Sequence, residues 1–213
     1  MHIRNILLCL SALVLASCAH QGEPTDKQAV VATLKASFAE KGPAKLDRLD
    51  QSLMQAECSE ANSSGKAMDE KDSALRQKAI QDHIPYPKDG VYLGDWREGE
   101  KIAQNGRGLQ FSDAVGAANG ANCYACHQLS PAELSFGNIG PSLLKYGVLR
   151  GVKDPASKDA EPIVKYTWAK IWNSHAFSTC SNMPRFGDAG ILTEQQVKHV
   201  MALLLDPKSH VNQ

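Results

Sequence analysis

The pentapeptide Cys-Tyr-Ala-Cys-His at residues 123–127 constrains what this chain can fold into more than any other feature. Two residues between the cysteines place the thiols so that they reach the two vinyl groups of a haem, and the histidine that follows can bind the iron. A chain that carries a covalent haem has to fold around it. We therefore predict one haem c per chain, attached to Cys123 and Cys126, with His127 as an axial iron ligand.

Two other kinds of site also use closely spaced cysteines. A thioredoxin-like redox pair shares the Cys-x-x-Cys spacing, but it belongs to a βαβ context, and strand patterns are almost absent from this sequence. A zinc site needs further Cys or His ligands at short spacing, whereas the remaining cysteines are single and distant. Haem is the favoured interpretation, and both alternatives stay open.

A second axial ligand is expected because low-spin electron carriers fill both axial positions of the iron. The candidates after the motif are Met183, Met201, His175 and His199. We favour Met183 because it lies in a non-helical loop that Pro184 stiffens, ahead of the last predicted helix. Met201 falls on the apolar face of that helix and is more simply explained as a core residue.

Axial histidines usually donate their second ring N–H to an oxygen that fixes the orientation of the ring. The loop at Gly140-Pro141 follows the motif at a suitable distance. We expect the Pro141 carbonyl to accept this bond; the alternative is that Gly140-Pro141 is only a turn.

The N-terminus has the layout of a secretory signal peptide, with a weakly basic start and an apolar run over residues 6–16. This run is too short to span a bilayer, which needs roughly 20 apolar residues. Leu15-Ala16-Ser17-Cys18 resembles a bacterial lipobox, which predicts a signal peptide over residues 1–17 and lipidation of Cys18. Ordinary cleavage after Ala19 is the alternative. We therefore predict a periplasmic protein without a transmembrane helix, attached to a bacterial membrane by a lipid anchor.

The six cysteines leave an even remainder once the expected modifications are assigned. Cys9 leaves with the signal peptide, Cys18 carries lipid, and Cys123 and Cys126 carry haem. Cys58 and Cys180 remain, and in an oxidising compartment they predict a disulfide that stabilises the fold by about 4–5 kcal/mol in the chain-entropy model. Two buried free thiols are the alternative.

Apolar spacing predicts an all-α fold. Short helices are expected over residues 30–38 and 46–53, a turn at 62–65, a weaker helix over 69–81 and a break at 85–90, followed by helices over 95–104, 164–175 and 193–206. The predicted organisation is a tether over residues 18–28, a helical extension over 29–90 and a haem domain over 91–213. The 23 basic and 23 acidic residues balance, so we expect no nucleic-acid partner.

Several segments of residues 92–213 together resemble the SoxX family, the monohaem cytochrome subunit of the thiosulfate-oxidising Sox system. The most telling are Cys180-Ser181-x-Met183-Pro184-Arg185-Phe186-Gly187 and Asp206-Pro207-x-Ser209-x-Val211-Asn212; the haem motif with its Asn122, Gly140-Pro141-Ser142-Leu143 with Tyr146-Gly147, and Leu192-Thr193-x-x-Gln196 also match. The long segment 25–90 and the lipobox depart from the shortest family members.

The resemblance implies a class I-like cytochrome c domain and a role as the electron-transfer subunit of a heteromeric enzyme. In that family a SoxA subunit holds the catalytic haem, and thiosulfate is attached to a cysteine of the SoxYZ carrier (L-cysteine S-thiosulfotransferase activity). The X subunit, with a His/Met haem matched here by His127 and Met183, passes electrons to a soluble cytochrome c. The chain alone is then not catalytic. The alternative is a free-standing, membrane-tethered cytochrome c shuttle.

Overall fold

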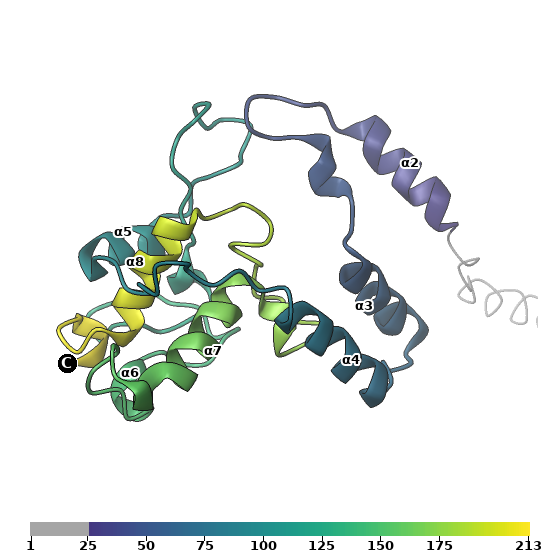
Figure 1. Ribbon diagram of the computed structural model, residues 1–213. Helices are drawn as coiled ribbons and strands as arrows, with labels where there is room; N and C mark the ends of the chain where they lie inside the picture. The colour runs from purple at the N-terminus through teal and green to yellow at the C-terminus, as the bar shows by residue number, and fades with distance from the viewer. Residues whose placement is uncertain (1–25) are drawn as a thin grey trace, which may run out of the picture. The chain divides into compact units, whose positions relative to one another are not determined.

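The computed structural model describes residues 26–213, which divide into a first compact unit that ends at Ala39 and a second over residues 40–213 (Figure 1). The described part of the first unit contains one helix, α2 (Lys27–Ser37), which begins where the Asp26 carboxylate accepts a hydrogen bond from the Gln28 backbone N–H at 2.9 Å. The helix expected over 30–38 therefore starts slightly earlier, within the predicted tether. The predicted signal peptide, Cys18 and the start of the tether lie outside the described residues.

The second unit opens with a short 3-10 helix, η1 (Leu46–Leu49), followed by α3 (Leu53–Ser64) and α4 (Glu70–Gln81). The helix predicted over 46–53 was wrong, because Ser52 caps a new helix there in a capping box with Gln55. The turn predicted at 62–65 was also wrong for residues 62–64, which form the last turn of α3. Gly65 ends that helix in the left-handed conformation, at φ 67°.

Two helices that are far apart in the sequence lie side by side, as Figure 1 shows: α5 (Trp96–Gln104) and α8 (Glu194–Leu205). Gly99 permits this contact, since a Cβ there would lie 2.2 Å from the His199 carbonyl oxygen. α8 begins at the capping box predicted at Thr193. The Gln196 N–H donates to the Thr193 hydroxyl, and the Thr193 N–H donates to the Gln196 side-chain oxygen.

α7 (Glu161–Trp172) and the short α6 (Tyr146–Leu149) pack against α8 and complete an apolar core. Trp168 and Met201 are fully buried in it. At the C-terminus, the Asn212 side chain accepts from the Gly147 N–H at 2.9 Å and donates to the Leu204 carbonyl at 3.0 Å. The C-terminal residues are thereby fixed to α6 and α8.

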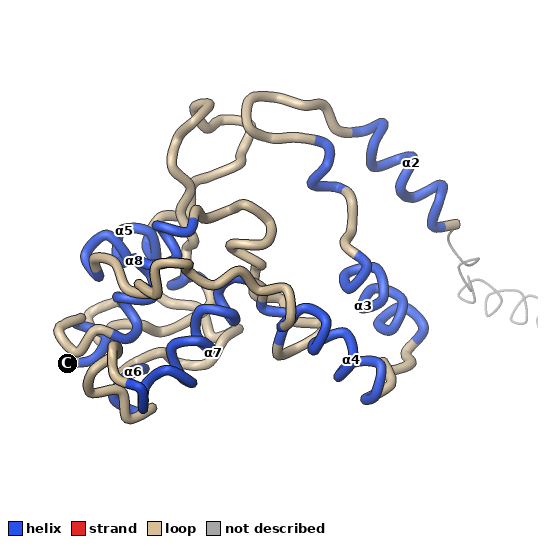
Figure 2. Tube along the Cα trace, viewed as in Figure 1, coloured by secondary structure: helices blue, strands red, loops and turns tan. Residues whose placement is uncertain are grey.

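The predicted all-α class is confirmed as far as the secondary structure goes: Figure 2 shows helices and loops but no strand over residues 26–213. The remaining short elements are 3-10 helices: η2 (Cys123–Ala125), η3 (Lys158–Ala160), η4 (Ser174–Ala176) and η5 (His210–Asn212). Within the same described range, no helix combines the length and the apolar character that a membrane span requires.

Candidate functional site

The Cys-x-x-Cys-His segment forms a tight turn that α5 holds in place. Asn122 adopts the left-handed conformation and starts η2, and the Cys126 and His127 N–H groups both donate to the Cys123 carbonyl, at 3.1 and 2.9 Å. The Ala121 N–H donates to the Ile102 carbonyl of α5 at 2.9 Å. The motif is therefore anchored to the same helix that packs on α8.

Cys123 and Cys126 are free thiols, and both residues are half-buried. Burial raises the pKa of the Cys123 thiol to about 12. Such a thiol is almost entirely protonated at neutral pH, which is unlike the low-pKa cysteine of a dithiol oxidoreductase.

The His127 ring is held by a hydrogen bond at one of its two nitrogens. Its Nδ1 lies 2.7 Å from the Pro141 carbonyl oxygen. Because a carbonyl can only accept, Nδ1 carries a proton, and in the neutral ring Nε2 is the nitrogen with the lone pair. Over residues 26–213, Nε2 has no hydrogen-bond partner in the protein. The ring thus presents one basic nitrogen for coordination.

Gly140 completes the cradle of this ring. Its N–H donates to the Cys126 carbonyl at 2.8 Å, and a Cβ at this position would lie 2.1 Å from His127 Cε1 and 2.4 Å from Nδ1. Only a residue without a side chain lets the backbone approach the ring so closely.

Met183 is held by its backbone in the loop predicted for it. The Ser174 hydroxyl donates to the Met183 carbonyl at 2.5 Å, and the Met183 N–H donates to Ser181 Oγ at 3.2 Å. The side chain is half-buried and packs, like that of Cys123, against the apolar core. Gly187 closes the loop on the Trp172 ring, where a Cβ would come within 2.2 Å.

Two of the other candidates for the second axial ligand, Met201 and His199, have structural roles. Met201 is enclosed in the core of α8, as expected for a core residue. His199 Nδ1 accepts from the Asp95 N–H at 2.8 Å at the start of α5. His175 is buried, and this burial together with the nearby Arg185 lowers its pKa.

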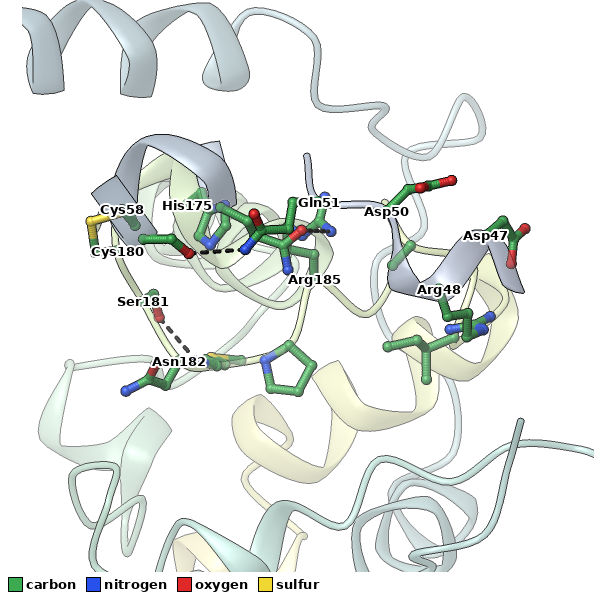
Figure 3. A pocket seen from close by; sticks show the side chains of 16 residues that line it. Asp47, Arg48, Asp50, Gln51, Cys58, His175, Cys180, Ser181, Asn182 and Arg185 are labelled. Carbon is green, nitrogen blue, oxygen red and sulfur yellow. Dashed lines mark hydrogen bonds between the residues drawn. A yellow bond between two sulfur atoms is a disulfide. The ribbon is translucent and has the colours of Figure 1, made fainter. Parts of the chain in front are cut away.

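Cys58 of α3 and Cys180 form a disulfide, with their Cα atoms 5.5 Å apart and 122 residues between them in the sequence. Beside it is a cavity of about 660 Å³, shown in Figure 3, to which the segment 47–59 and the loop 180–191 both contribute. Met183 and His175 line this cavity, whereas Cys123, Cys126 and His127 do not.

One polar group beside the motif has no signal in the sequence. Glu100 of α5 accepts a hydrogen bond at 2.9 Å from the hydroxyl of Tyr124, which directly follows Cys123 in the motif. The other Glu100 oxygen is buried without a hydrogen bond, 3.4 Å from His210 Nε2. No sequence pattern separates this glutamate from an exposed one on the same helix.

Over residues 26–213 no three His, Cys, Asp or Glu side chains come together as a metal-binding cluster. No protein-family model matches the chain. A curated protein of Aquifex aeolicus (strain VF5), described as an uncharacterized lipoprotein, is 33% identical over 213 residues, covering 96% of this chain and 96% of that protein.

Proposed function

This chain belongs to the family of the Aquifex aeolicus lipoprotein, and from that premise we propose that it is itself an exported lipoprotein, anchored to a bacterial membrane through Cys18. The Leu-Ala-Ser-Cys sequence that ends at residue 18 supports this proposal. Several acyl chains on one residue are enough for stable attachment without a membrane-spanning helix.

The proposed cofactor is one haem c, bound by thioethers to Cys123 and Cys126. The observation that carries this proposal is the His127 ring, whose Nδ1 is fixed by the Pro141 carbonyl at 2.7 Å while Nε2 stays free beside two unpaired cysteines. A metal-binding histidine typically has this second partner. When bound, the haem would supply reversible one-electron chemistry.

Met183 is the proposed second axial ligand. It lies on a loop whose backbone Ser174 and Ser181 fix, and it packs on the same core as Cys123. With His127 and Met183 both on the iron, no coordination position is left for a substrate. The chain would then relay electrons and would not bind thiosulfate at the metal.

The assignment to the SoxX role rests on the Met-Pro-Arg-Phe-Gly and Asp-Pro segments of the sequence. We propose that the chain takes electrons from a SoxA-type cytochrome, while thiosulfate is attached to a SoxYZ-type carrier, and delivers them to a soluble cytochrome c. The class I cytochrome c fold is part of this proposal. The second candidate is a free-standing tethered shuttle, which the lipobox favours.

The first experiment is a haem stain of a denaturing gel, after expression with a haem-attachment system, since only covalent haem survives denaturation. We expect staining of the wild-type chain and of Met183→Leu, and none of a Cys123→Ala/Cys126→Ala double variant. A wild-type chain without stain would refute the cofactor proposal.

A second experiment separates the two electron-transfer roles. The tagged chain, purified gently from its own organism, should bring a second haem protein with it if it is a SoxX-type subunit. The isolated chain should show no thiosulfate-dependent turnover until that partner is added. Purification of the chain alone would favour the tethered shuttle.

A further inference from the structure

The loop that carries Met183 is attached from outside by α3 and α4. Cys58 of α3 forms the disulfide with Cys180, three positions before Met183. The Arg185 guanidinium, two positions after Met183, donates to Gln55 Oε1 of α3 at 3.3 Å. Attachments on both sides of Met183 therefore lead to the same helix.

A third attachment supports the base of the loop. Gln81 at the end of α4 donates through Nε2 to the Ala176 carbonyl at 2.6 Å. Ala176 closes η4, which also contains the Ser174 hydroxyl that donates to the Met183 carbonyl. The segment 51–81 thus contacts the loop and the element on which the loop rests.

Packing alone does not hold the loop on this side. The cavity of about 660 Å³ in Figure 3 lies against it, lined by Met183 and Pro184 of the loop and by Gln51 and Gln55 of the segment before and within α3. This space is partly open to solvent and is not a void inside the core, so it is not filled by packed side chains. On this side the loop is restrained by the hydrogen bond from Arg185 to Gln55 and by the disulfide at Cys180, and the disulfide is the one covalent restraint among the described contacts.

α3 itself has little apolar contact to secure it. Met54 is its one buried residue, and Leu53 remains exposed. Without the disulfide, α3 would be held mainly by hydrogen bonds of partly exposed side chains, which are weak individually. The loop and α3 would be released together.

Building on the haem ligation proposed above, we propose that Cys58 and Cys180 are positioning residues for Met183: their disulfide holds the loop so that the thioether stays on the iron. Once the disulfide is absent, states with Met183 off the iron become more populated. The sixth position then opens to external ligands, and the potential falls because thioether ligation raises it.

The test compares a Cys58→Ser/Cys180→Ser double variant with a Glu57→Gln control. Glu57 lies next to Cys58 on α3, but its partner is Arg76 of α4, at 2.5 Å, so the control perturbs the extension without touching the Met183 loop. The readouts are the thioether-to-iron charge-transfer band of the oxidised protein, the midpoint potential, and the rate of imidazole binding to the ferric haem.

The expected result is faster imidazole binding by at least about ten-fold in the double variant, a weaker charge-transfer band and a lower potential, with the control like the wild type. Equal values in all three proteins would overturn the proposal. A wild-type chain that lacks covalent haem would refute the proposed function as well, and the haem stain distinguishes that outcome from this one.

A second measurement uses the wild-type chain, in case the double variant does not fold. A water-soluble phosphine and water convert the disulfide into two thiols and a phosphine oxide. The ferrous protein is then exposed to carbon monoxide, which needs an open iron position. Carbon monoxide binding only after phosphine treatment is expected. Binding that is the same before and after treatment would contradict the positioning role.

Discussion

Gly140→Ala tests whether the backbone beside the motif sets the orientation of His127. The added Cβ would lie 2.1 Å from Cε1 and 2.7 Å from Nε2 of the ring, far inside van der Waals contact. The ring must move, and the 2.7 Å bond from Nδ1 to the Pro141 carbonyl is then strained or lost. Overpacking costs about 1–3 kcal/mol and a lost hydrogen bond about 1 kcal/mol, so the free energy of unfolding should fall by about 2–4 kcal/mol.

The assay is urea unfolding of the haem-loaded protein, with the Soret spectrum recorded alongside to follow the histidine ligand. Gly106→Ala is the matched control, because its Cβ would meet the side-chain nitrogen of the exposed Asn122 at 3.2 Å and that side chain can move away. The control should change stability by less than about 0.5 kcal/mol. Equal stability and equal spectra of the two variants would refute the reasoning about the His127 cradle.

Two further predictions concern other parts of the fold. Thr193→Ala removes one half of the capping box of α8, and unfolding in urea should show a loss of about 1 kcal/mol; an unchanged midpoint would mean that packing alone fixes the start of α8. Burial and Arg185 lower the pKa of His175, so between its folded and unfolded pKa values the unfolded chain binds more protons and stability rises with pH. The stability supported by neutral His175 should therefore decline as pH falls below about 6.5. The free energy of unfolding, measured between about pH 5 and about pH 7.5, should decline less steeply in His175→Gln than in the wild type. Equal pH dependence of the two proteins would contradict the lowered pKa of His175.

Helices with strong local signals could be predicted from the sequence. Asp95 and Thr193 cap α5 and α8 as expected, because a side-chain cap depends on residues only two or three positions apart. α3 was missed because it buries almost no apolar side chain and so has no clear periodicity. It is connected to the rest of the unit by a disulfide and a few polar contacts, which leave no such pattern.

The candidate site likewise combines contacts that the sequence predicts with contacts that it does not. The bond between His127 and Pro141 follows from a short, local chain segment, and the structure has it at 2.7 Å. The contact of Glu100 with Tyr124 depends on where α5 crosses the motif. The cradle at Gly140 depends on how one loop folds back on a ring. Such contacts are set by three-dimensional packing, and spacing along the chain does not encode them.

The disulfide between Cys58 and Cys180 also bears on the order in which this protein has to mature. The Cys-x-x-Cys-His motif lies inside the loop that this bond closes, and residues 26–213 contain four cysteines, which can pair as two disulfides in three ways. Thioether formation at Cys123 and Cys126 would withdraw two of them and leave a single pairing. With the proposed haem, an exported chain that received it before oxidation would avoid mispaired products, whereas early oxidation of Cys123 or Cys126 would block haem attachment.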